Sequence, residues 1–119
     1  MKFTPNFSEA EPIKSGIYLV KVMECDSHIS QNNNPYLRWK LKITGTEFDG
    51  RYVWINTVLK GTGAGILKQF LLAINPNYQF STFDVEDCLG KMININLSFN
   101  GSSKGYPDVI SMDPVTKIN

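Results

Sequence analysis

Apolar and polar residues alternate without interruption from Tyr36 to Ile43, in the stretch YLRWKLKI. A period of two is typical of a β-strand with one buried face, because successive side chains of a strand point to opposite sides. The pattern predicts that the inward side chains are Leu37, Trp39, Leu41 and Ile43, and that the outward ones are Tyr36, Arg38, Lys40 and Lys42. Three cations on one face of one strand repel one another unless solvent, carboxylates or an anionic ligand offsets their charge.

Four further strands are predicted from β-rich runs separated by turn residues. The predicted strands are 16–25, with Tyr18, Val20 and Val22 on one face; 51–58, with Val53 and Ile55 opposite Tyr52, Trp54 and Asn56; 92–99, with Ile93, Ile95, Leu97 and Phe99 inward; and roughly 106–112. The segments 26–35, 45–50 and 100–105 are rich in Asp, Ser, Asn or Gly and are predicted to be loops.

Between the third and fourth strands the apolar spacing changes to about 3.6, which predicts a helix from Thr62 to Ile74. Its expected buried face is Ile66, Leu67, Phe70, Leu71 and Ile74. Thr62 is the candidate N-cap, and Asn75-Pro76 ends the helix. The motif GTGAG at the start of this helix is not followed by the Gly-Lys-Ser or Gly-Lys-Thr of a phosphate-binding loop. A short helical turn is expected in 81–90, capped by Ser81 or Thr82 and closed by Gly90.

The order strand, strand, strand, helix, strand, strand matches the OB-fold, a five-stranded Greek-key barrel with a helix between strands three and four. The fold class is therefore predicted to be all-β with one helix. Residues 1–15 are expected to form an N-terminal arm and residues 16–119 the OB-fold domain. An immunoglobulin-like sandwich is the structural alternative, but it requires about seven strands and no central helix.

Composition limits the chain to one domain of 119 residues with a net charge of +1, so overall basicity gives no argument for a nucleic-acid partner. There is no apolar run of membrane-spanning length and no signal-peptide core at the N-terminus, so a cytoplasmic protein without membrane contact is expected. Cys25 and Cys88 form no CxxC pair, and His28 is the sole histidine. We therefore expect no metal, no cofactor, no small-molecule substrate and no enzymatic activity.

In an OB-fold, strands two and three present the ligand-binding face, flanked by the loops joining strands one to two and four to five. The sequence therefore predicts a nucleic-acid-binding surface of Tyr36, Arg38, Lys40, Lys42, Tyr52, Trp54 and Asn56, with Lys21 from strand one and Lys104 and Tyr106 from the last loop. His28 or the asparagines 32–34 are expected to contribute from the first loop. Cations would follow the phosphates while aromatic rings stack on bases.

Other roles for these residues remain open. The cations could form an ordinary solvated face. Tyr52 and Trp54 could pack beneath the N-terminal arm against Phe3 or Phe7, or form a face between two copies of the chain. Lys104 and the asparagines could be ordinary loop polarity.

The segments GIYLVKV, NNNPYLRWKLKI, DGRYVW and CLGKMININL, within Gly16 to Pro114, resemble a family of small phage and prophage proteins. These are similar to OB-fold single-stranded DNA-binding proteins. The resemblance implies sequence-tolerant binding of single-stranded DNA in phage replication, recombination or repair, without catalysis, in the host bacterial cytoplasm. Many such proteins end in an acidic tail that recruits replication enzymes. This chain ends DPVTKIN, so no such recruitment is expected.

Two hypotheses of different classes follow. The first is a single-stranded DNA-binding protein. The alternative is a protein-interaction module that uses the same aromatic face as a homo-oligomer or adaptor interface. Carbohydrate binding is a third option that aromatic rings would suit but three aligned cations would not.

Overall fold

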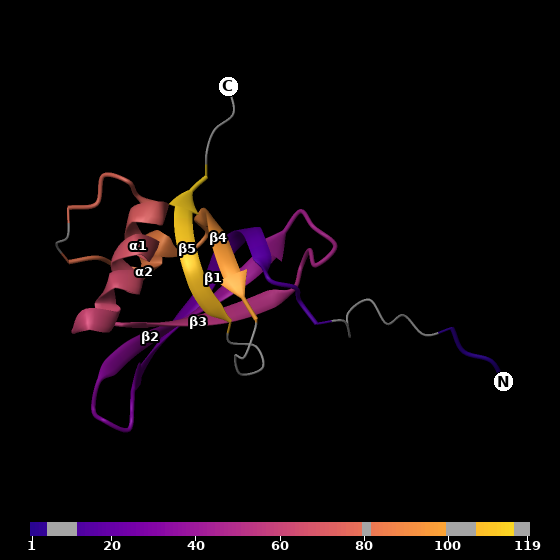
Figure 1. Ribbon diagram of the computed structural model, residues 1–119, viewed down its shortest axis with the longest axis horizontal. Helices are drawn as coiled ribbons and strands as arrows, with labels where there is room; N and C mark the ends of the chain where they lie inside the picture. Colours follow the sequence, from indigo (N-terminus) through magenta and orange to yellow (C-terminus); the bar gives the residue numbers. More distant parts are fainter. Residues whose placement is uncertain (5–11, 80–81, 100–106, 116–119) are drawn as a thin grey trace.

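Five strands form a single antiparallel sheet in the computed structural model, which describes residues 1–4, 12–79, 82–99 and 107–115 (Figure 1). The strands are β1 (Gly16–Ile29), β2 (Pro35–Thr44), β3 (Tyr52–Val58), β4 (Met92–Ser98) and β5 (Asp108–Pro114). The helices are the 3-10 turn η2 (Thr62–Ala64), α1 (Gly65–Ile74) and α2 (Val85–Cys88). The predicted class, mostly antiparallel β with a helix between strands three and four, is confirmed. The two sheets of the sandwich alternative are not found among these residues.

The strand order is β3-β2-β1-β4-β5, so β3 and β5 are the edges of the sheet. Closing the sheet into a barrel would require these two edges to pair. No such ladder joins the described residues, and the sheet is open. Helix α1 contacts β5, β3 and β4, so it lies across the opening between the two edges and covers the buried face there.

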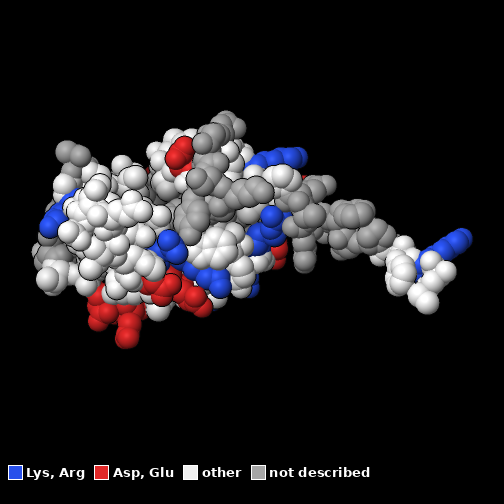
Figure 2. All heavy atoms as spheres, turned by 90° about the horizontal axis from the view of Figure 1, so that it is seen from below, with Lys and Arg blue, Asp and Glu red and all other residues white. Residues whose placement is uncertain are grey.

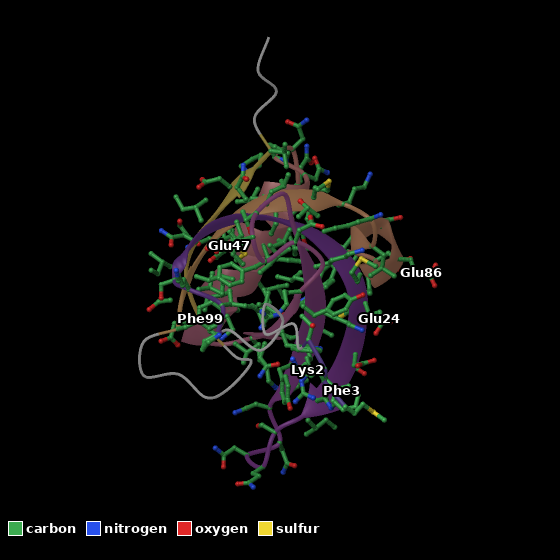
Figure 3. All side chains as sticks on the ribbon, turned by 90° about the vertical axis from the view of Figure 1, so that its right-hand side faces the viewer. Lys2, Phe3, Glu24, Glu47, Glu86 and Phe99 are labelled. Carbon is green, nitrogen blue, oxygen red and sulfur yellow. The ribbon has the colours of Figure 1, made fainter. Side chains whose placement is uncertain are left out.

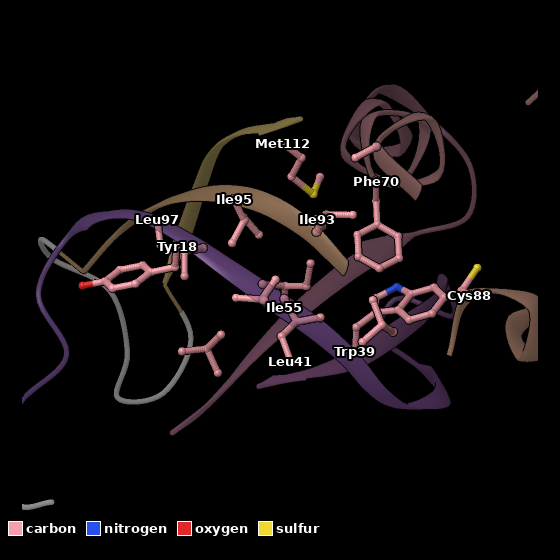
Figure 4. Close-up of a cluster of buried hydrophobic side chains, with 14 of the residues drawn as sticks. Tyr18, Trp39, Leu41, Ile55, Phe70, Cys88, Ile93, Ile95, Leu97 and Met112 are labelled. Atoms are coloured by element: carbon pink, nitrogen blue, oxygen red, sulfur yellow. The ribbon is translucent and has the colours of Figure 1, made fainter. Parts of the chain in front are cut away.

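The buried core follows the alternation of the strands. Leu37, Trp39, Leu41 and Ile43 of β2 are all buried, as are Val53 and Ile55 of β3 and Ile93, Ile95 and Leu97 of β4. Figure 4 shows side chains from β1, β2, β3, β4 and β5 gathered with Phe70 of α1 in one buried cluster. The predicted inward faces of these strands are therefore correct, although Phe99 follows the end of β4 and is only partly buried.

Trp39 anchors the centre of this core and is 0% exposed. Its indole Nε1 donates a hydrogen bond of 2.9 Å to Oγ1 of Thr57, and its ring lies 4.5 Å from the ring of Phe70. Thr57 is also buried. The hydrogen bond allows a polar indole nitrogen to be buried between β2, β3 and α1, since an unpaired buried donor is costly.

Two helix predictions need correction. Helix α1 begins at Gly65 with Ala64 as its N-cap, so Thr62 belongs to the preceding 3-10 turn and is not the cap. The buried residues of α1 are Leu67, Phe70, Leu71 and Ala73, whereas Ile66 is 37% exposed. Helix α1 is three residues shorter than predicted, and its first turn lies at the rim of the core. Ile66 belongs to this turn and therefore lies outside the core.

The cap of α2 is Asp84, whose carboxylate accepts a hydrogen bond of 3.0 Å from the backbone N–H of Glu86. The prediction of Thr82 as the cap is wrong, and Ser81 lies outside the described residues. Gly90 has φ +82°, which a side chain would disfavour, and it donates to the carbonyl of Val22. This bond joins the end of α2 to β1.

Strand β1 is four residues longer than predicted and continues through Asp26–Ile29. The connection to β2 is a short turn at residues 30–34, in which Asn33 has φ 59° and the N–H of Asn34 donates to Oγ of Ser30. Ladder hydrogen bonds with β2 outweigh the turn preference of Asp26, Ser27 and His28.

The N-terminal residues 1–4 lie away from the sheet, and Phe3 is 81% exposed (Figure 1). Phe3 therefore does not cover Tyr52 or Trp54, while Phe7 lies outside the described residues. Ile13 packs against the core, and Oγ of Ser15 accepts a hydrogen bond from the N–H of Phe99. In the described part of the chain, no helix has the length and apolar character needed to cross a membrane.

Candidate functional site

The outward side chains of β2 and β3 form one continuous surface. The register pairs Arg38 with Asn56, Lys40 with Trp54 and Lys42 with Tyr52. Residues directly opposite in antiparallel strands project to the same face, with Cβ atoms about 5 Å apart. Each cation of β2 therefore stands beside a ring or an amide of β3, as the sequence predicts. This surface is called the basic-aromatic face below; it consists of Lys21, Tyr36, Arg38, Lys40, Lys42, Tyr52, Trp54 and Asn56.

Lys40 lies at the centre of the basic-aromatic face. Its Nζ is 4.3 Å from the centre of the Tyr52 ring and 4.0 Å from Oε2 of Glu24, and its side chain is 28% exposed. The rings of Tyr52 and Trp54 lie 6.4 Å apart at 45°. A cation over an exposed ring contributes on the order of 0.5 to 1 kcal/mol, so these contacts hold Lys40 against the sheet while leaving its charge near solvent.

Tyr52 and Trp54 are partly open to solvent, and Tyr52 is 39% exposed. Asn56 is exposed as well. Both rings belong to β3, which is an edge of the sheet, so a ligand can approach them from beside β3 as well as from above. The rings are thus available for stacking in a way that Trp39 is not.

Lys21 extends the basic-aromatic face onto β1. It is exposed and lies opposite Lys42 of β2 and Met92 of β4. Lys21, Lys42 and Tyr52 therefore form one row across three strands. The structure thus places Lys21 of β1 on the same surface as Lys42, as the sequence predicts.

Two carboxylates that sequence reasoning missed lie against the same cations. Glu24 is opposite Lys40 and Asp26 is opposite Arg38. Strict alternation from Val20 and Val22 would turn both acids inward. A β-bulge between Val22 and Glu24 adds one residue and reverses the facing of the strand beyond it, so the acids point outward and Cys25 points to the core.

Acidic and basic side chains are partly separated on the side of the molecule that faces down in Figure 1. Figure 2 views the molecule from below Figure 1 and shows Lys and Arg in the middle of that side, with Asp and Glu gathered at the lower left edge. Figure 3 shows Glu24 of β1 and Glu86 of α2 on the same side of the molecule, away from Glu47. On the β1 side, Glu24 and Asp26 lie opposite Lys40 and Arg38 and so bound these cations.

The hairpin end of the face carries a pair of rings. His28 lies opposite Tyr36, with ring centres 5.4 Å apart and planes 20° from parallel. The prediction that His28 belongs to a loop is wrong, since it lies within β1. Tyr36 does lie on the predicted face. Lys104 and Tyr106 lie outside the described residues.

Both thiols are poor nucleophiles. Burial, with Asp26 and Cys88 nearby, raises the pKa of Cys25 to about 12, and burial beside Asp87 and Asp84 raises the pKa of Cys88 to about 11. Because the thiolate is the reactive form, neither thiol is activated near neutral pH. The described residues hold no cluster of three or more His, Cys, Asp or Glu that could bind a metal ion.

Two hollows of about 610 Å³ each lie against α1 and share Leu71, Tyr78, Thr82 and Phe83. One of them also contains Cys88, Asp84, Asp87 and Lys91. Their lining contains no histidine and no residue of the basic-aromatic face. The basic-aromatic face is the better candidate site because it combines fixed cations with accessible rings.

In comparisons with known proteins, no family model matches this chain, and no curated protein matches it.

Proposed function

We propose that this chain binds single-stranded DNA with little regard to sequence, without catalysis or a cofactor, and acts in DNA replication, recombination or repair. The observation that carries the proposal is the pairing of Arg38, Lys40 and Lys42 with Asn56, Trp54 and Tyr52 across β2 and β3. A chain with a net charge of only +1 gains from this arrangement a local line of cations beside aromatic rings on which bases can stack.

The spacing suits a flexible polyanion. Cations at every second residue of β2 are about 6.7 Å apart along the strand, and the pleat keeps them on one side. A single strand can adjust its backbone to successive cations, whereas its bases can turn toward the rings of Tyr52 and Trp54. Stacking on an aromatic ring contributes on the order of 1 to 3 kcal/mol per base and does not discriminate strongly among bases.

We also propose that the fold is of the OB type. The strand order and the helix between β3 and β4 support this assignment, since an OB-fold is a partly open five-stranded Greek-key barrel. Its ligand face is formed by strands two and three, which here carry the basic-aromatic face. The resemblance to phage single-stranded DNA-binding proteins points in the same direction.

Fluorescence titration with oligothymidine tests the proposal. Binding should quench Trp54. In a mobility-shift assay, Trp54→Ala should weaken affinity by about 5- to 150-fold for every base sequence, as expected for one lost stack. Trp39→Phe is the matched control, because Trp39 is fully buried and its replacement should leave affinity unchanged. Unaltered emission together with no mobility shift at low salt would refute DNA binding, and parallel titrations with duplex DNA and RNA define the preferred nucleic acid.

A second candidate function is a contact between two copies of this chain through the same rings. The observation that favours it is the position of Tyr52 and Trp54 on the edge strand β3. An edge strand can pair with another chain through its free backbone groups. Light scattering across a dilution series should then reveal a dimer that Trp54→Ala dissociates, whereas a monomer at all concentrations would exclude this candidate.

A further inference from the structure

Carboxylates stand directly beside the cations that the proposed DNA site uses. Glu24 and Asp26 are exposed, lie opposite Lys40 and Arg38 in the register, and are turned outward by the bulge of β1. Glu24 approaches Lys40 to 4.0 Å. We infer that Glu24 and Asp26 form an anionic border that admits one phosphate chain and disfavours a second, so that the face selects single-stranded over duplex DNA. This inference rests on the proposed function.

The border lies at an outer limit of the sheet. Strand β4 pairs with β1 only from Gly16 to Lys21, and the backbone bonds of Val22 with Gly90 and Lys91 end that contact. In the described residues no strand lies beyond Glu24 and Asp26 on that side. A phosphate chain displaced from β2 toward β1 therefore comes close to these two carboxylates before it passes the edge of the sheet.

On the opposite side of the face, the described β3 partners of Arg38 and Lys40 form no such border. Across β2 from the acids stand Trp54 and Asn56 of β3, which carry no charge. Adjacent strands are about 4.8 Å apart, so the surface from β1 to β3 is only about 10 Å wide. One phosphate chain over β2 with its bases toward β3 fits this width and keeps its charges away from Glu24 and Asp26.

A duplex cannot use the face in this way. Its bases are paired and cannot reach the rings, and its second phosphate chain lies across a groove about 6 or 12 Å wide. With one chain on the cations of β2, a second chain on the β1 side lies near the carboxylates. Like charges then repel, and juxtaposed like charges are a common means of rejecting a wrong partner.

The test is the double variant Glu24→Gln/Asp26→Asn, assayed in the full chain at about 50 mM salt with oligothymidine and with a duplex of the same length. The charge-matched control is Asp108→Asn/Asp113→Asn, which removes two exposed carboxylates from β5, at the other edge of the sheet from β3. Thermal unfolding of both variants verifies that the amide replacements leave the fold intact.

We expect the Glu24/Asp26 variant to bind single strands about 3-fold more tightly and duplex about 10-fold more tightly or better, so that the selectivity ratio falls. The control should leave the ratio unchanged. Three results would overturn the inference: equal gains in affinity for both DNA forms, no gain for either form, or the same fall of the selectivity ratio in the control. In each case, wild-type binding to single strands would still support the proposed function. A wild-type chain that binds no single strand would instead refute the proposed function and the inference with it.

Discussion

Replacing Lys40 by methionine removes one cation from the centre of the basic-aromatic face while keeping an unbranched side chain of similar length. In the wild type, Nζ of Lys40 lies 4.3 Å from the centre of the Tyr52 ring and 4.0 Å from Glu24. The methionine can still pack on Tyr52, so the variant changes charge more than shape. Because surface ion pairs contribute about 1 kcal/mol or less, losing the pair with Glu24 should leave stability nearly unchanged.

The magnitude follows from the number of cations on the face. Lys21, Arg38, Lys40 and Lys42 can neutralise four phosphates if all of them bind. Each neutralised phosphate of a single strand contributes about −0.7 to the slope of log affinity against log salt, so the limiting slope is about −2.8 for the wild type and about −2.1 for the variant. Between about 50 and 200 mM salt, affinity should then fall about 50-fold for the wild type and about 18-fold for Lys40→Met.

The assay is a fluorescence titration with oligothymidine at four or more salt concentrations for the wild type, Lys40→Met and Lys68→Met. Lys68 lies on α1, which packs against the buried side of the sheet, and its replacement changes net charge equally. Lys68→Met should retain the wild-type slope. An unchanged slope in Lys40→Met, or the same reduction in both variants, would show that Lys40 contacts no phosphate and would refute the reasoning.

Three further predictions concern the core and the thiols. Thr57→Val removes the acceptor of the Trp39 indole and should lower the free energy of unfolding by about 1 to 3 kcal/mol in urea denaturation, whereas an unaffected midpoint would mean that the 2.9 Å bond contributes nothing. Iodide should quench only the emission that Trp54→Phe removes, because Trp39 is 0% exposed; quenching that persists in this variant would contradict the burial of Trp39. The pKa values of Cys25 and Cys88, raised to about 12 and 11 by burial, make folding favour the neutral thiols. Stability from this source is complete below the unfolded pKa near 8.5 to 9 and is lost as pH rises toward 11 to 12, so the unfolding midpoint should fall in that range, and Cys25→Ala/Cys88→Ala should reduce the fall.

Much of the fold could be predicted from the order and period of the apolar residues. The alternation in Tyr36 to Ile43 predicts the facing of β2 correctly, since a period of two allows only one face of the strand to reach the core. The paired facing of Tyr52, Trp54 and Asn56 on β3 is likewise correct. The predicted helix is correct in kind and position, although its first three residues, Thr62–Ala64, form the 3-10 turn η2 that precedes α1.

The errors arise where neighbours in space change a local preference. Asp26, Ser27 and His28 favour turns by composition, but they gain ladder hydrogen bonds with β2 and become strand. Closure of the barrel is a separate case, which the described residues leave unconfirmed; it depends on whether the edge strands β3 and β5 meet. The pattern of apolar residues along the chain does not specify the distance between β3 and β5. In the structure, α1 contacts both of these edge strands.

The sequence by itself determined which side chains of β2 face solvent, because the alternation of apolar and charged residues leaves that strand a single acceptable orientation. On β3 both faces carry apolar groups, so the structure was needed to decide that Val53 and Ile55 are the buried ones. Only the tertiary structure decided what stands beside the solvent-facing side chains of β2. Cross-strand register depends on pairing between distant segments, and the bulge after Val22 reverses β1 so that Glu24 and Asp26 face Lys40 and Arg38. One inserted residue thus turns two carboxylates from the core side to the basic-aromatic face, a change that no period along the chain reveals.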